Sequence, residues 1–346
     1  MIFCGDTLLP STYDKSFLLK DGSDFWLKQK VVNFESSIHL ESLAKSTKGI
    51  ALESDLTTAA FLKDLAVKCV SLSNNHFFDY PVDVKRQKDF FFDAGIEAIG
   101  AGSNITEASA PYYNHDEDIV VISFGWNVIR CKYATAKSAG VNPYEYSWVE
   151  SQVRKYRNEF PTATLVAFMH WNYEFEQYPQ PADREFSHYL IDLGVDAIIG
   201  HHAHIIQGFE YYNGKPIFYG LGNCYFPNAK YAGFDLSFPE NTRHGLSVEI
   251  GQSACKAYVT ELKNNSQLKV VAEGPPESIA AVSSVSCFQG LSSDQYLEFF
   301  KENRVKTKLL PIYRSYRHKI RNEIFDKFVI YRQLPVDLLS KLRGRR

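Results

Sequence analysis

The hydrophobic residues of this chain fall into short apolar runs, separated by segments in which apolar positions recur with helical spacing. The runs predict buried strands at residues 28–37, 67–76, 96–103, 118–126, 164–171, 195–202 and 215–223. Segments 55–67, 82–95 and 182–194 have the helical spacing, and Gly194 ends the last of them. Strands and helices in alternation predict an α/β domain.

The pattern changes after these elements. Residues 245–272 alternate apolar and polar side chains, which predicts antiparallel strands at one edge of the sheet. Residues 273–286 are rich in Pro, Ser and Ala and interrupt the strand pattern, and segment 293–305 then predicts a helix. We therefore divide the chain into a domain of residues 1–272 and a helical, basic C-terminal extension of residues 273–346.

The end of the chain is strongly basic. Residues 301–346 contain 14 Lys and Arg against 4 Asp and Glu, whereas the whole chain has a net charge of −2. Segment 313–334 predicts a helix. The apolar residues expected to share one of its faces are Ile320, Ile324, Phe325 and Phe328. This segment is either a solvated helix or a contact for a membrane surface, a synthase or an acidic polymer. We do not expect a nucleic-acid partner, because no groove-reading module is recognisable.

Composition limits the class of protein further. Hydrophobic residues make up 45% of the 346 residues, enough for a sizeable core. The chain shows neither a signal-peptide pattern nor an apolar run of the ~20 residues that span a bilayer. The six cysteines are widely spread without a CxxC pair, which favours reduced, mostly buried thiols over a zinc–thiolate site. We expect a cytoplasmic protein, either free or peripheral to the membrane.

Polar side chains able to bind metals recur where the predicted strands end. They are Asp6, Asn33, Glu35, Asn74, Asn75, His76, His170, Glu174, His201, His202, His204 and Asn223. Strand ends converge on one edge of an α/β sheet, so we expect these side chains to meet there. Their oxygen and nitrogen donors suit one or two divalent ions of Mn, Fe or Zn.

Each of these residues also has a plain structural interpretation. Gly5-Asp6 alone is typical of a turn, His170 alone of a core histidine, and Glu174 of a solvated loop charge. The segment GHHAH, residues 200–204, is harder to explain in this way. Burying three imidazoles costs free energy of desolvation unless each finds a partner. This segment therefore favours a metal centre.

The series GDTLLP, NFESS, SLSNNHFFD, MHWNYEF, GVDAIIGHHAHIIQG and YGLGN resembles the CapA family. That family is named for accessory proteins of poly-γ-glutamate capsule synthesis. The resemblance covers roughly residues 1–250 and leaves the basic extension unexplained. It implies a metallophosphoesterase-like double β-sandwich flanked by helices, with a metal centre at one edge.

The resemblance also implies roles for individual residues. The expected metal ligands are Asp6, Glu35, Asn75, His170, His202 and His204. Glu35 would bridge two ions, with Asn75, His170 and His202 around one and Asp6 and His204 around the other. The expected catalytic residues are His76, as a proton donor to the leaving group, and Glu174. The expected substrate contacts are Asn74, Trp171, His201 and Asn223. Sugar stacking or core packing are the alternatives for the aromatic residues Trp126, Trp171, Tyr173 and Tyr178.

The sequence departs from the related patterns at two positions. Metallophosphoesterases begin with Asp-x-His, whereas Leu8 follows Asp6-Thr7 here, as in CapA proteins, and leucine cannot bind a metal. This weakens one of the two expected metal sites. Asn172 stands where the family usually has glycine after His-Trp, which would add a hydrogen-bonding group or a steric block near the substrate.

Two functions from different classes follow. The first is a metal-dependent hydrolase of capsule or surface-polymer metabolism, in which the metal lowers the pKa of water from about 15.7 to about 7 and the hydroxide attacks a phosphoester, ester or amide. The second is a non-catalytic accessory factor for polymer assembly that docks through its basic C-terminal segment. The ligand set alone does not choose the bond that is cleaved.

Overall fold

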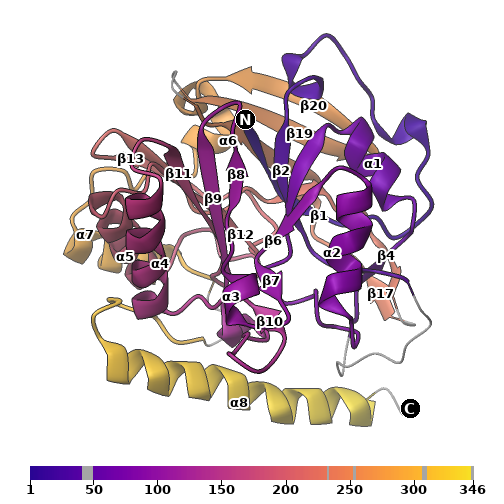
Figure 1. Ribbon diagram of the computed structural model, residues 1–346. Helices are drawn as coiled ribbons and strands as arrows, with labels where there is room; N and C mark the ends of the chain where they lie inside the picture. The colour runs from indigo at the N-terminus through magenta and orange to yellow at the C-terminus, as the bar shows by residue number, and fades with distance from the viewer. Residues whose placement is uncertain (41–49, 232–233, 252–254, 306–309, 344–346) are drawn as a thin grey trace.

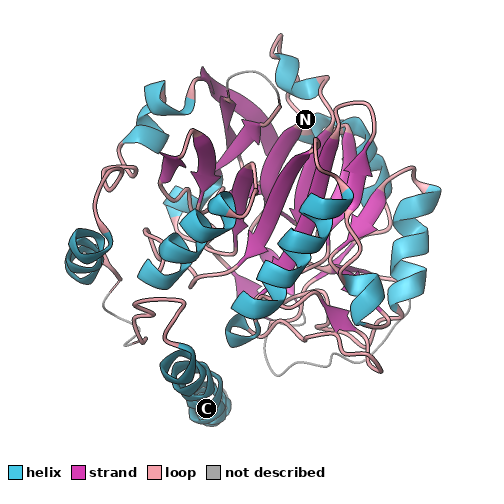
Figure 2. Cartoon of the chain, turned by 60° about the vertical axis from the view of Figure 1, so that its left-hand side comes forward, coloured by secondary structure: helices cyan, strands magenta, loops and turns pink. Residues whose placement is uncertain are grey.

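The computed structural model describes residues 1–40, 50–231, 234–251, 255–305 and 310–343, and shows two β-sheets face to face with helices on their outer faces (Figures 1 and 2). The first sheet has the order β20-β19-β18-β1-β2-β5-β6, with β15 also paired to β1. Its strands are β1 (Ile2–Thr7), β2 (Lys30–Phe34), β5 (Val67–Ser71), β6 (Glu97–Ile99), β15 (Asn223–Tyr225), β18 (His244–Glu249), β19 (Lys256–Lys263) and β20 (Gln267–Gly274). β1, β2, β5 and β6 are parallel, while β18 to β20 form the expected antiparallel edge.

The second sheet has the order β13-β14-β12-β11-β9-β8. Its strands are β8 (Tyr112–Asn114), β9 (Ile119–Gly125), β11 (Thr164–His170), β12 (Ala197–His201), β13 (Phe209–Tyr212) and β14 (Lys215–Phe218). The four central strands are parallel and the two outer strands are antiparallel to them. Short strand pairs lie outside both sheets: β3 (Ser37–Ile38) with β4 (Glu53–Ser54), β7 (Ala101–Gly102) with β10 (Gly140–Val141), and β16 (Ala229–Tyr231) with β17 (Phe234–Leu236).

Alternation along the strands divides the core into two layers. Phe3, Val31, Val166 and Ile199 belong to a buried cluster between the sheets, whereas their neighbours along the strands face the helices. The helices are α1 (Thr58–Asp64), α2 (Val84–Asp93), α3 (Ile105–Ala108), α4 (Tyr146–Glu159), α5 (Pro181–Asp192), α6 (Ala280–Ser283), α7 (Ser293–Asn303) and α8 (Lys319–Arg343). The double β-sandwich flanked by helices is confirmed. α4 was not predicted from the sequence.

The C-terminal segment packs on the rest of the molecule. Phe288, Tyr296 and Phe300 are buried in the same core layer as the helices of residues 1–272. The helix expected at 313–334 begins instead at Lys319, because residues 313–318 form an irregular segment with a turn, in which Tyr313 is buried. The predicted apolar face is also wrong in one member: Phe325 packs on the core, while the other three residues of that set are exposed.

Two expectations from composition can be compared with this fold. All six cysteines are free; four are buried, and Cys255 and Cys287 are more accessible. Among the described residues, no helix is both long enough and apolar enough to cross a membrane.

Candidate metal centre

The parallel strands of both sheets end at one edge, and the candidate ligands follow those ends. Asp6 on β1 pairs with Asn33 on β2, and Glu35 comes just after β2. In the other sheet His170 ends β11 beside His201, the last residue of β12. The turns after β2, β5 and β12 then add the remaining ligands, so residues far apart in the sequence meet at one place.

Two groups of buried side chains there could each hold a metal ion. The first is Glu35, His170 and His202, and the second is Asp6, Glu35 and His204; within each group the possible ligand atoms lie within 4.8 Å of one another. Glu35 belongs to both groups, with Oε1 3.6 Å from His170 Nε2 and 3.9 Å from His204 Nε2. Glu35 is therefore the residue that the two candidate groups share.

The carboxylate of Glu35 is the least satisfied polar group of the cluster. The side chain is fully buried, and neither oxygen accepts a hydrogen bond from the described residues. Burial, followed by the charges of Asp6, Glu174 and Asp79, raises the pKa of Glu35 well above its usual range. A buried carboxylate without donors is costly unless a proton or a cation compensates it. The oxygen and nitrogen donors around it suit a divalent cation.

Burial favours the neutral imidazole at His170, which is the form that metal binding requires. Burial, with the neighbouring imidazoles of His202, His201 and His204, lowers the pKa of His170 well below its usual range. A neutral imidazole has a free nitrogen lone pair for a metal. The backbones of His202 and His204 have φ values of 85° and 57°, a conformation that L-residues rarely adopt and that recurs at functional sites.

Three asparagines contact the candidate ligands Asp6, His170 and His204. The amide of Asn33 donates to Asp6 Oδ1 at 2.7 Å and lies 3.2 Å from His170 Nδ1. Asn75 Oδ1 lies 2.7 Å from His170 Nε2, and Asn223 Oδ1 lies 2.9 Å from His204 Nδ1. Asn33 follows the strand-end rule but was given no role in the sequence analysis. Asn223 contacts a ligand, which favours an orienting role over a substrate contact.

His76 and Glu174 are the more accessible members of the site. His76 Nδ1 lies 2.6 Å from Asp79 Oδ2, and the His76 side chain is 18% exposed, against 3% or less for His170 and His204. Asp79 was missed in the sequence, although its position three residues after His76 was a local signal. Glu174 is half-buried and close enough to raise the pKa of Glu35.

The side chains of His201, Trp171 and Asn74 are occupied by packing or hydrogen bonds and are not free to contact a substrate at the cluster. His201 points between the sheets, where its ring packs 4.0 Å from that of Phe168, because it is the last residue of the alternating strand β12. The buried Trp171 donates to the carbonyl of Tyr219 at 2.9 Å. The amide of Asn74 donates to the carbonyl of Phe34 at 2.7 Å. A substrate contact by these residues has no support in this geometry.

The remaining aromatic candidates also favour the core interpretation. Trp126 and Tyr173 are buried and pack against each other. Tyr178 is half-buried, with its ring 6.0 Å from that of Phe288. Asn172 is buried in a positive-φ turn and donates to the carbonyl of Tyr178 at 3.1 Å. Its amide therefore holds the loop after β11.

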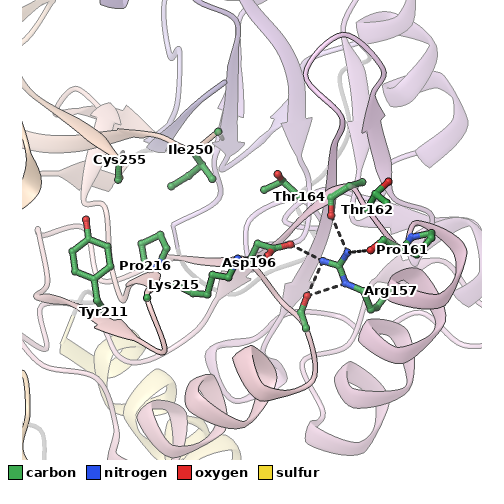
Figure 3. Close-up of a pocket in the computed structure, with 14 residues that line it drawn as sticks. Arg157, Pro161, Thr162, Thr164, Asp196, Tyr211, Lys215, Pro216, Ile250 and Cys255 are labelled. Carbon is green, nitrogen blue, oxygen red and sulfur yellow. Dashed lines mark hydrogen bonds and ion pairs between the residues drawn. The ribbon is translucent and has the colours of Figure 1, made fainter. Parts of the chain in front are cut away.

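A large open pocket lies elsewhere, where the strands begin (Figure 3). It has a volume of about 820 Å³ and is lined by residues near the starts of β11, β12 and β14. Its charges are paired with one another: Arg157 contacts Asp196 at 2.6 Å and carbonyl oxygens, and Lys215 contacts Asp196 at 2.7 Å. The pocket therefore offers weaker evidence of a site than the buried cluster at the opposite edge.

Comparison with known proteins agrees with the motifs. Residues 1–228 match the family described as "Bacterial capsule synthesis protein PGA_cap", so the chain belongs to this family, and the resemblance to CapA is confirmed. It is similar to "PGA biosynthesis protein CapA" of Bacillus subtilis (28% identity over 56% of this chain and 52% of that protein) and to "Capsule biosynthesis protein CapA" of Bacillus anthracis (29% identity over 56% and 49%). The chain thus spans about half the length of these curated relatives.

One solved structure with a related chain path is that of a 5'-nucleotidase precursor from Thermus thermophilus. The likeness covers 63% of this chain and 40% of that chain, at 14% sequence identity and a TM-score of 0.32. These values are too low to bear on function.

Proposed function

We propose that this protein is a metal-dependent hydrolase of capsule or surface-polymer metabolism, holding one or two ions of Mn, Fe or Zn. The observation that carries the proposal is the buried carboxylate of Glu35, which accepts no hydrogen bond from the described residues and belongs to both candidate ligand groups. The names of the relatives, which refer to capsule and PGA biosynthesis, support poly-γ-glutamate or a related polymer as the substrate.

The donors present fit such an ion. Glu35, Asn75, His170 and His202 would hold one ion, and Asp6, Glu35 and His204 the other. A divalent ion bound there would polarise the reacting bond and lower the pKa of a water molecule. The chain itself favours a neutral imidazole at His170 by burial and fixes Asp6 and His170 through Asn33.

His76 would move a proton, and its contact with Asp79 and its partial exposure support this role. Its Nδ1 is held by Asp79 at 2.6 Å, which favours the tautomer with hydrogen on Nδ1 and leaves Nε2 to exchange a proton with the substrate. Its partial exposure allows contact with a leaving group. Glu174, also at the accessible side, would orient the attacking water. These two residues would act on a phosphoester, an ester or an amide alike.

Metal content is the first test of this proposal. Untagged protein purified without added metal should contain Mn, Fe or Zn in near-stoichiometric amount by elemental analysis. The double variant His202→Ala/His204→Ala should lose it, whereas His115→Ala, which removes an exposed histidine far from the cluster, should keep it. Absence of metal from the wild type, with no uptake on titration, would refute the proposal.

Catalysis needs a separate test. Metal-loaded protein should release product from at least one substrate in a panel of phosphoesters, esters and γ-glutamyl amides, and His76→Ala should lower kcat by about a hundredfold while keeping the metal. Unchanged turnover in His76→Ala would remove this residue from the mechanism.

A second candidate, the non-catalytic accessory factor, is favoured by one observation. Leu8 stands where metallophosphoesterases place a histidine ligand, and it is fully buried in an apolar cluster with Leu52 and Phe226. The ion near Asp6 and His204 therefore receives no ligand from position 8. Bound metal without turnover of any substrate in the panel would favour this candidate over the hydrolase.

A further inference from the structure

Helix α8 exposes a row of large apolar side chains. Ile320, Ile324, Phe328 and Tyr331 are 78%, 59%, 52% and 65% exposed. They are separated by four, four and three residues, a spacing that places them along one face of a helix. We call these four residues the apolar row. A contiguous group of this kind on a protein surface usually marks a binding face.

The opposite face of α8 holds the helix on the molecule. Phe325 packs with its ring 5.6 Å from that of Tyr313, and the hydroxyl of Tyr313 donates to Asp326 at 2.8 Å. The amide of Asn322 donates to the carbonyl of Ser315 at 2.9 Å. The helix is therefore already anchored by one side, and the apolar row is not needed for that packing.

Basic residues surround the apolar row. Lys319, Arg321 and Lys327 are exposed on the helix, and Arg314 and Arg317 are exposed just before it. Among the described residues of α8, Glu323 is the exposed acid, since Asp326 is half-buried against Tyr313. An apolar row bordered by Lys and Arg is typical of a helix that lies among the headgroups of an anionic membrane.

The position of α8 relates this surface to the metal centre. The helix runs along one end of the molecule (Figure 1) and contacts the 3-10 turn Asn127–Ile129, which directly follows β9. That turn lies at the edge where the strands of the second sheet end, as His170 does on the neighbouring β11. α8 and the candidate metal centre therefore lie toward the same end of the sheets.

We propose that α8 docks this protein on an anionic phospholipid surface. The helix axis lies in the membrane plane, the apolar row enters the headgroup region, and the surrounding Lys and Arg contact lipid phosphates. Docking turns the strand-end edge of the sandwich toward the membrane. The net positive charge of the described part of α8 and its approach favours lipid over a second copy of this chain, which would bring like charges together.

Vesicle co-sedimentation of the full chain tests this inference. The wild type should bind phosphatidylcholine vesicles that contain phosphatidylglycerol, bind phosphatidylcholine alone at least about tenfold more weakly, and dissociate as salt is raised. Ile324→Ser/Phe328→Ser should weaken binding roughly tenfold or more. Leu27→Ser removes an equally exposed apolar residue elsewhere, 85% exposed, and should bind as the wild type does.

Other outcomes would overturn the proposal. Equal vesicle binding by the wild type and Ile324→Ser/Phe328→Ser would exclude α8 as the docking surface. Equal binding of the wild type to both vesicle types would exclude a requirement for anionic lipid. Sedimentation velocity without vesicles tests the alternative that a second copy of this chain covers the apolar row. If the wild type forms a dimer and the double variant does not, the apolar row serves self-association. Unchanged melting temperatures should show that the variants fold, because both residues are exposed.

Discussion

The carboxylate of Glu35 lies between imidazoles that come from two places in the second sheet, the end of β11 and the turn after β12. It is buried beside Asp6, so without a cation the folded protein must hold a protonated acid or a costly charge. An ion would remove that cost while gaining the neutral imidazole of His170 as a ligand. At the scale of single residues, the site is thus less stable empty than loaded.

Glu35→Gln is expected to separate the cost of the buried acid from the stabilisation that a bound ion gives. Without metal, the variant should melt a few degrees above the wild type, because an amide replaces an acid that burial disfavours in its charged form. Added Mn or Zn should raise the melting temperature of the wild type only. Thermal unfolding with and without metal measures both, with the exposed Glu277→Gln as control. An equal metal-induced rise in both proteins would contradict a ligand role for Glu35.

The buried Asp183 on α5 and the half-buried Asp326 on α8 are close enough to interact electrostatically. Burial raises the pKa of Asp183 on α5 to about 7, and the nearby charge of Asp326 on α8 adds to the rise. Burial also raises the pKa of Asp326 to about 6. The hydroxyls of Tyr144 and Tyr313 donate to these acids at 2.9 and 2.8 Å. The packing of these elements is therefore linked to protonation.

Asp183→Asn should flatten the pH dependence of stability. Because the folded-state pKa lies above the unfolded value of about 3.9, Asp183 contributes stability that is present at low pH and is lost as pH rises through about 7. Relative to Asp183→Asn, the wild type should lose roughly 2–3 kcal/mol between pH 5 and pH 8. Urea unfolding at each pH measures this difference. Parallel pH profiles of wild type and variant would contradict it, and the exposed Asp93→Asn should follow the wild type.

At the scale of the whole molecule, the C-terminal extension has two parts, one that packs into the core and the helix α8. Phe288, Tyr296 and Tyr313 are part of the core, and Arg184, which forms an ion pair with Glu210 at 2.7 Å, also donates to the carbonyl of Leu291 at 3.0 Å. In the part of α8 whose side chains are described, residues 319–332, one face packs on the molecule and the apolar row is exposed. A test of what the basic helix does must therefore remove α8 without removing α7.

Two truncations should behave differently. A chain ending at Val285 loses the buried Phe288, Tyr296 and Phe300, each worth about 1.5–3 kcal/mol of burial, and should be insoluble or melt far below the wild type. A chain ending at His318 should stay folded and keep its metal. Solubility, thermal melting and elemental analysis compare the two. A stable protein ending at Val285 would show that the core of residues 1–272 is independent after all.

Local pattern was enough to predict many of the strands that form the sandwich. Apolar runs such as 118–126 and 164–171 became β9 and β11, because a strand buried on both faces needs an apolar residue at nearly every position. The ligand types at the strand ends could also be predicted, since parallel strands deliver their last residues to one edge. The helix α4 was missed even though Val149, Val153 and Tyr156 recur at helical spacing.

The sequence by itself determined the α/β class and which chemical groups reach one edge, because these depend on residue type and short-range periodicity. Its motifs determined the family, and the two-sheet architecture was predicted through that resemblance. Only the tertiary structure decided which groups face one another. His202 and His204 enter the cluster while His201 enters the sandwich, since the chain leaves β12 through positive-φ residues that end the strand alternation. Likewise, contact with Tyr313 turned Phe325 inward and left the apolar row of α8 outside. Such choices depend on packing between distant segments, which local spacing does not encode.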